Sequence, residues 1–232
     1  MEKLIITTPA GEMPVYFFPK SDDAPLVVLL MDAIGVRDEL KSLARDIQAL
    51  GYNVALPSLY YREGHYEDMD FGDPEVHAKV MQLYGSLTHE MVREDIAALL
   101  SAMEQRPVGL LGFCMGGANA LIMAGSFPDD IAVAVAVHPG GITTHAKDSP
   151  HRIAARAKGK LYIAIADEDP YATADQVAAL EASLKLGDVD YTLEVYEGAH
   201  HGFAFASLPS FNAQAQQRYW QATCRAFNEA LG

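Results

Sequence analysis

The fold is decided by the stretch Gly112-Phe113-Cys114-Met115-Gly116-Gly117, which follows an apolar run at 108–111 and opens an apolar segment at 115–125. The change of pattern at Gly112 predicts a strand, a tight turn and a helix in direct succession. Glycines two positions away on either side of Cys114 leave room for neighbouring backbone at such a turn. The stretch has the G-x-S-x-G pattern of a nucleophile elbow, with cysteine in the serine position.

Cys114 stands where a cysteine gains reactivity. The helix predicted to begin directly after it presents free amide groups and a dipole, both of which favour a thiolate. An arbitrary free cysteine is more often an inert core residue, and we expect that of Cys224, which lies within a helical pattern. The glycine patterns of phosphate-binding loops are absent. We therefore expect Cys114 to be a nucleophile.

Working outward from the elbow, β-rich runs recur between helical stretches, which predicts an α/β fold with a mainly parallel sheet. Two early runs, 4–7 and 15–18, are predicted to pair antiparallel. Further strands are predicted at 26–31, 52–56, 108–111, 131–137, 161–166 and 191–196. Helices are predicted at 37–50, 92–103, 115–125, 176–186 and 211–231. Residues 60–87 are the least regular part, predicted as a loop with one short helix, and 1–232 are expected to form a single domain.

A nucleophile elbow is followed along the chain by an acid and then a histidine. The strand at 161–166 is followed by Asp167, Glu168 and Asp169. We favour Asp169 because it lies past the strand end, in the turn before a helix, while Asp167 and Glu168 remain alternatives.

The histidine is expected in the segment after the next strand, where His200 and His201 form the only adjacent histidine pair. We favour His201 as the base because the small Gly202 follows it, whereas His200 is expected to pack or to face solvent.

Composition narrows the classes of partner. The 232 residues carry 17 Lys and Arg against 31 Asp and Glu, a net charge of −14, and no run of basic residues. Such a surface repels nucleic acid and anionic membranes. Two cysteines exclude a disulfide scaffold. Metal-binding patterns are absent, so we expect no metal and no cofactor. No targeting segment is evident, and we expect a cytoplasmic monomer or small homo-oligomer.

With these residues in place, the chain resembles the dienelactone hydrolase family of α/β-hydrolases over essentially its whole length. The matching stretches are Met31-Asp32-Ala33-Ile34-Gly35-Val36, Pro57-Ser58-Leu59-Tyr60-Tyr61-Arg62, the elbow, His138-Pro139-Gly140-Gly141 and Gly198-Ala199-His200-His201-Gly202-Phe203. The resemblance implies an α/β-hydrolase fold, a mainly parallel twisted sheet with helices on both faces. It also implies a Cys114-His201-Asp169 triad that cleaves an ester or lactone through an acyl-enzyme, with backbone amides of Met115 and Ala33 as the oxyanion hole.

The chain also departs from the family. Members that hydrolyse dienelactone have an early-loop glutamate that contacts the resting thiol, and the aligned residue here is Asp32, one methylene shorter. They bind the substrate carboxylate with arginines, and Phe205 stands at one of those positions, while 68–88 hold no arginine. We therefore expect a small, rather apolar ester or lactone as substrate. The candidate substrate-binding residues are Ile34, Tyr60, Phe203 and Phe205.

Two other functions stay open on the sequence. The missing arginines and the shorter acid at Asp32 would fit a non-catalytic, ligand-binding or regulatory protein that retains the fold. A redox sensor built on Cys114 is a further alternative, although no resolving cysteine lies near it in the sequence.

Overall fold

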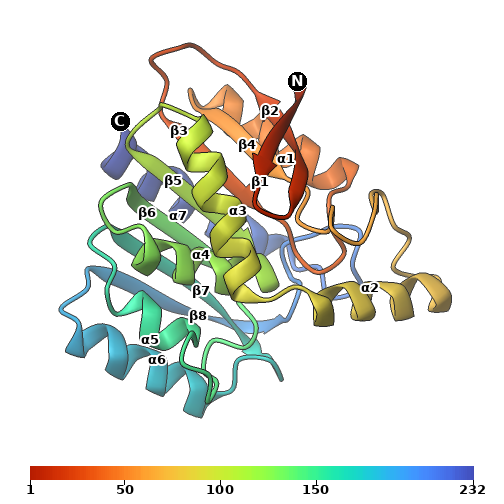
Figure 1. Ribbon diagram of the computed structural model, residues 1–232. Helices are drawn as coiled ribbons and strands as arrows, with labels where there is room; N and C mark the ends of the chain where they lie inside the picture. The colour runs from red at the N-terminus through yellow and green to blue at the C-terminus, as the bar shows by residue number, and fades with distance from the viewer. The chain divides into compact units, whose positions relative to one another are not determined.

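The computed structural model describes residues 1–232, and its contacts divide the chain into two units, Met1–Arg106 and Pro107–Gly232 (Figure 1). Each unit combines sheet strands with helices, and each is described by itself below. The expectation of one domain over 1–232 stays a prediction. No helix in either unit has both the length and the hydropathy needed to cross a bilayer.

The first unit holds four strands in the order β1-β2-β4-β3. Their bounds are β1 Glu2–Thr8, β2 Gly11–Phe18, β3 Leu26–Leu30 and β4 Asn53–Pro57. β1 and β2 form the predicted antiparallel hairpin, β2 also pairs antiparallel with β4, and β3 runs parallel to β4. All residues of β3 and β4 are buried, as continuous apolar runs predict for strands covered on both faces.

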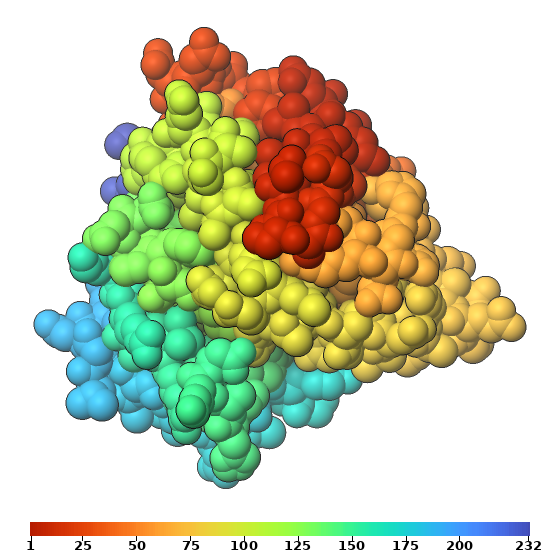
Figure 2. All heavy atoms as spheres, in the orientation of Figure 1, coloured from red at the N-terminus to blue at the C-terminus, as the bar shows by residue number.

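Three helices belong to this unit: α1 Asp38–Ala49, α2 Pro74–Ser86 and α3 His89–Ala102. α1 buries Leu40, Ala44 and Ile47, which its helical spacing places on one face, and it packs on β2 and β4. α2 has 13 residues and buries only Val80 and Leu83. It projects from the other elements of the unit in Figure 1, and its atoms form the yellow protrusion in Figure 2.

The second unit holds four parallel strands in the order β5-β6-β7-β8. Their bounds are β5 Val108–Phe113, β6 Ile131–Val137, β7 Lys160–Glu168 and β8 Tyr191–His200. Its helices are α4 Met115–Ser126, α5 Pro150–Ala154, α6 Ala174–Leu186 and α7 Ala213–Leu231. Parallel strands place all their carboxyl ends at one edge of the sheet, and the loops that follow β5, β7 and β8 carry the expected site residues.

Helices cover both faces of this sheet. A Cβ built on Gly109 would lie 2.8 Å from Leu231 of α7, whereas one built on Gly112 would lie 2.0 Å from the Gly116 carbonyl oxygen of α4. Residues 109 and 112 of one strand point to opposite faces, so α4 and α7 lie on opposite sides (Figure 1). α4 is buried from Met115 to Gly125, which explains why it is apolar all round.

The structure confirms the predicted strands and long helices within a few residues at their ends. It differs in two places. Residues 60–87 hold a helix of 13 residues, α2, rather than a short one, and Asp73 caps it by accepting a hydrogen bond from the Glu75 amide. The five-residue helix α5 has no counterpart among the predicted elements, because a helix of that length shows no apolar period.

Candidate active site

Cys114 occupies a strained turn between β5 and α4. Its backbone angles are φ 52° and ψ −115°, a left-handed value that non-glycine residues adopt rarely. The turn is held because the Cys114 amide donates to Val137 (3.1 Å) and its carbonyl accepts from Ala118 (3.1 Å). The elbow geometry predicted from the sequence is therefore present, with the thiol partly exposed.

Gly112 makes this turn sterically feasible. The first turn of α4 passes so close to β5 that any Cβ at residue 112 would overlap the carbonyl group of Gly116. The reason inferred for glycines in the motif, room for neighbouring backbone, is confirmed at this position.

His201 and Asp169 meet at the carboxyl ends of β8 and β7. His201 Nδ1 lies 2.8 Å from Asp169 Oδ2, and the other carboxylate oxygen accepts the Tyr171 amide at 2.8 Å. The Asp169 side chain is fully buried, and that of His201 is 16% exposed. Because Asp169 engages Nδ1, the tautomer with its proton on Nδ1 is favoured and Nε2 is left for the reaction.

The environment of His201 favours its protonated form. Burial lowers the pKa of His201, but the hydrogen bond with Asp169 and the nearby Cys114 side chain outweigh it and raise that pKa to about 10. The buried Nε2 atom forms no hydrogen bond within normal geometric limits, but the Cys114 side chain lies close enough to favour the protonated ring.

The alternative acids and histidine have other partners. Glu168 Oε2 lies 3.6 Å from His200 Nδ1, and both side chains are largely exposed. Asp167 accepts the Gly198 amide at 3.3 Å. Only Asp169 contacts His201, and its carboxylate is the buried one.

Four expected site residues lie in the first unit, where Asp32 has a partner that the sequence did not suggest. Both Asp32 oxygens contact Arg37, at 2.8 and 2.9 Å, and one also accepts the Ile34 amide at 3.0 Å. This pair is buried. The thiol-contacting role expected of Asp32 stays a prediction, and it would require the carboxylate to be shared with Arg37.

Tyr60 is buried, and its hydroxyl donates to the Ala33 carbonyl at 2.8 Å. This bond fixes the peptide that carries Ala33 and Ile34, although the pairing of the Ala33 and Met115 amides as an oxyanion hole stays a prediction. Tyr60 therefore orders the early loop, whatever it contributes to substrate binding.

Phe203 and Phe205 are buried in an aromatic cluster of the second unit. The ring centroid of Phe205 lies 4.7 Å from that of Phe113, and the ring centroid of Phe203 lies 5.1 Å from that of His138. These rings support the segment that carries His201. Their role in substrate binding stays a prediction.

Two residues beside His201 were not singled out as site residues from the sequence, His138 and Tyr171. His138 lies within a stretch that carried the family resemblance, yet its ring contact with His201 is a tertiary feature that sequence spacing does not reveal. The same holds for Tyr171, two residues after Asp169. No group of three or more His, Cys, Asp or Glu is arranged to hold a metal ion.

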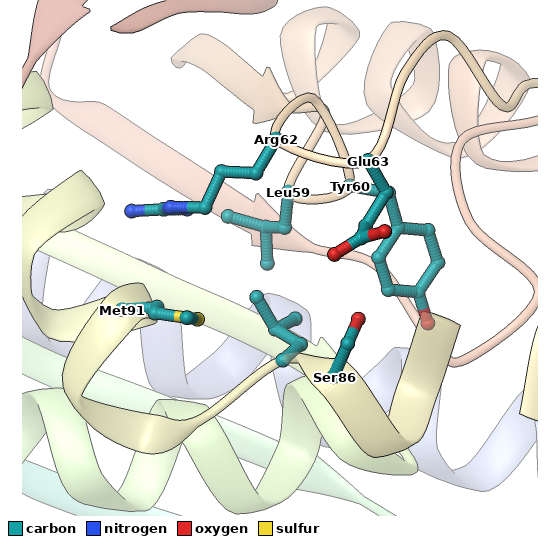
Figure 3. A pocket seen from close by; sticks show the side chains of 7 residues that line it. Leu59, Tyr60, Arg62, Glu63, Ser86 and Met91 are labelled. Atoms are coloured by element: carbon teal, nitrogen blue, oxygen red, sulfur yellow. The ribbon is translucent and has the colours of Figure 1, made fainter. Parts of the chain in front are cut away.

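A small cavity of about 20 Å³ lies within the first unit, between the loop after β4 and the ends of α2 and α3 (Figure 3). Leu59, Glu63 and Met91 are among its lining residues. A volume of this size holds about one water molecule. The cavity is therefore too small for an ester or lactone, and Arg62, which also lines it, is bound to Asp95.

Comparison with known proteins extends these findings. The model of the dienelactone hydrolase family matches residues 13–231. A carboxymethylenebutenolidase of Rhodococcus opacus is 27% identical over 97% of this chain and 89% of its own length. A probable 2-oxo-3-(5-oxofuran-2-ylidene)propanoate lactonase of a Bradyrhizobium species is 24% identical over 86% of this chain and 81% of its own.

Solved structures agree on the fold. A crystal structure from Klebsiella pneumoniae matches with a TM-score of 0.86 and 22% identity over 98% of both chains. A dienelactone hydrolase-like promiscuous phosphotriesterase from metagenomic libraries matches with a TM-score of 0.80 and 24% identity, over 100% of this chain and 98% of its own. The expectation of an α/β-hydrolase fold is confirmed.

Proposed function

The chain belongs to the dienelactone hydrolase family and is a hydrolase of that kind, and from this premise we propose that Cys114, His201 and Asp169 form its catalytic triad. The observation that carries the proposal is the 2.8 Å hydrogen bond between His201 and the buried Asp169, beside a cysteine held at a strained elbow. The reaction is cleavage of an ester or lactone bond.

In the first half-reaction, His201 Nε2 holds the proton given up by the Cys114 thiol. The Cys114 thiolate attacks the substrate carbonyl carbon and the C=O electrons move to oxygen. The amides of Met115, at the start of α4, and of Ala33 stabilise this oxyanion. When the oxyanion collapses, the C–O bond to the alcohol breaks, and the alkoxide takes the proton from His201 Nε2. An acyl-thioester on Cys114 remains.

In the second half-reaction, His201 Nε2 takes a proton from water as the water oxygen attacks the thioester carbonyl. Collapse of this second oxyanion expels the Cys114 thiolate and releases the carboxylic acid. Asp169 stays ionised throughout and stabilises the imidazolium ion, which agrees with the raised pKa of His201.

The substrate is proposed to be a small ester or lactone without a carboxylate. The curated relatives are named for lactones, which supports a cyclic ester, and both names denote lactones that also bear a carboxylate. Two features argue against an anionic one. Phe205 stands where family members that bind a carboxylate have arginine, and Arg37 already pairs with Asp32 through both carboxylate oxygens.

The test compares p-nitrophenyl butyrate with its carboxylated analogue, p-nitrophenyl hydrogen glutarate, on wild type and Cys114→Ala, and traps the acyl group by mass spectrometry. We expect acylation of Cys114 alone, loss of turnover in the variant, and a higher kcat/KM for the neutral ester. Full activity in Cys114→Ala would refute the triad. Absence of turnover across a panel of esters, lactones and thioesters would favour a non-catalytic binding protein, and preference for the anionic ester would refute the substrate class.

A further inference from the structure

The His201 ring is contacted by two other rings, one from the surface and one from the interior. The Tyr171 ring centroid lies 4.8 Å from that of His201, with an interplanar angle of 63°. The His138 ring lies 5.0 Å from it, with an angle of 66°. Edge-to-face contacts of this kind are orientation-dependent, so they restrict how the imidazole is turned.

Tyr171 is fixed at its backbone but is not a core residue. Its amide donates to Asp169 Oδ1 and its carbonyl accepts from Gly141, both at 2.8 Å. The residue is nevertheless 59% exposed. A tyrosine side chain this exposed contributes little to the core, and its ring packs against the ring of His201.

His138 contacts the imidazole from the interior. It is 1% exposed and follows β6 directly, with a φ of 36° that is unusual for a residue with a side chain. Its amide donates to the Ala164 carbonyl at 2.8 Å, which ties the turn to β7. Strained backbone that the surrounding structure maintains is often found at functional positions.

Gly140 connects the two rings with the nucleophile. Its amide donates to the Cys114 carbonyl at 3.3 Å. A Cβ built on Gly140 would lie 3.4 Å from Tyr171 Cβ and 3.6 Å from His201 Cε1, so the backbone here runs against both residues. The segment 138–141 therefore joins the elbow, His201 and Tyr171 in one set of contacts.

We propose that Tyr171 and His138 are positioning residues that fix the orientation of the His201 ring between Asp169 and Cys114. The hydrogen bond to Asp169 holds the ring at Nδ1 alone and leaves it free to rock about that point. Contacts from the surface and from the interior limit this rocking and keep Nε2 directed at the reacting groups. The proposal rests on the catalytic role proposed above for His201.

The kinetic test uses Tyr171→Ala, Tyr171→Phe and, as a control, Tyr191→Ala at the opposite end of β8. Misorientation of a catalytic group costs up to about 100-fold in rate, so we expect kcat of Tyr171→Ala to fall ~10-fold to ~100-fold with KM within about twofold. Tyr171→Phe keeps the ring and should restore kcat, and the control should match wild type. A raised KM with unchanged kcat, or no change in either, would overturn the proposal.

A second measurement does not depend on activity. The NOE between the His201 ring proton at Cε1 and the α protons of Gly140, which lies against it, is expected to weaken in Tyr171→Ala and His138→Ala and to remain near the wild-type value in Tyr171→Phe. An unchanged NOE in both alanine variants would overturn the proposal even if the enzyme is active. If wild type hydrolyses nothing while the NOE changes as expected, the proposed function fails and the positioning of the His201 ring stands.

Discussion

At the scale of single residues, the backbone conformation of Cys114, the proposed nucleophile, depends on neighbours that take no part in the proposed reaction. A positive φ at a residue with a side chain costs about 1–3 kcal/mol, so the surrounding backbone must hold it in place. Gly112 allows the first turn of α4 to approach β5, and the backbone bonds of Cys114 to β6 and α4 keep the turn closed. The strain is thus maintained by packing around the proposed nucleophile.

The close approach of α4 to β5 predicts the effect of Gly112→Ala. A methyl group 2.0 Å from the Gly116 carbonyl oxygen must push α4 away from β5. We expect the free energy of unfolding, measured with urea, to fall by about 1–3 kcal/mol, with loss of esterase activity.

Gly85→Ala on α2 is the matched control, since no atom lies within 4 Å of its built Cβ. It should be neutral or stabilising by up to about 1 kcal/mol, because alanine favours helix. Equal stability of the two variants would contradict the role given to Gly112.

Asp169→Asn tests the partner of His201. An amide has nearly the same shape as the carboxylate, but it neither stabilises the imidazolium ion nor enforces the tautomer that leaves Nε2 available. We expect kcat for p-nitrophenyl butyrate to fall about 10³-fold to 10⁴-fold, by the behaviour of hydrolytic triads in general. Asp167→Asn should retain near wild-type activity, since Asp167 contacts Gly198 and not His201. The opposite ranking would assign the role to Asp167.

At the scale of elements, the ends of the parallel strands explain what the sequence could predict. The elbow, Asp169 and His201 each follow a predicted strand, and parallel strands bring such positions to one edge, so the hydrogen bond between His201 and Asp169 was foreseeable. The bond between Asp32 and Arg37 and the contacts of Tyr171 and His138 were not. They depend on the directions of side chains and on the paths of loops, and neither produces a periodic pattern in the sequence.

A buried ion pair joins the loop after β4 to α3. The sequence did not predict this pair either. Asp95 of α3 is fully buried and binds the Arg62 guanidinium through both oxygens, at 2.7 and 2.8 Å. One oxygen also accepts the Tyr61 hydroxyl at 2.8 Å. Burial, together with this bond, raises the pKa of Tyr61 to about 12. The loop that carries Tyr60 therefore depends on α3 for its position.

Asp95→Ala is expected to be strongly destabilising, because it leaves the charge of Arg62, whose side chain is only 13% exposed, without its partner. The free energy of unfolding should fall by about 3–5 kcal/mol in urea titrations. Glu90→Ala, which removes the exposed ion pair with Arg93 on the same helix, should cause no measurable change. A small effect of Asp95→Ala would mean that the loop is held by apolar packing instead.

At the scale of the whole molecule, the net charge of −14 affects the rate at which charged substrates reach the protein. Electrostatic repulsion slows the encounter with an anionic ester and is screened by salt, whereas a neutral ester is unaffected. The kcat/KM of p-nitrophenyl hydrogen glutarate is therefore expected to rise as NaCl is raised from about 0.01 to 0.15 M, the range over which the screening length shortens from about 30 to 8 Å. That of p-nitrophenyl butyrate should stay constant. A fall for the anionic ester would indicate a cationic binding site.

Global stability should report the protonation of His201. Because the folded state raises the pKa of His201 from 6.5 to about 10, it binds this proton more tightly than the unfolded chain does. The stabilisation is fully present below pH ~6.5 and is lost as pH rises through about 10. The free energy of unfolding of wild type minus that of His201→Gln should therefore be largest near pH 6 and decline by several kcal/mol towards pH ~10.5.

His200→Gln, which removes the exposed neighbouring histidine, supplies the baseline. A wild-type advantage that grows with pH would mean that His201 is held neutral, and the ion pair with Asp169 would then have no part in holding β7 and β8 together.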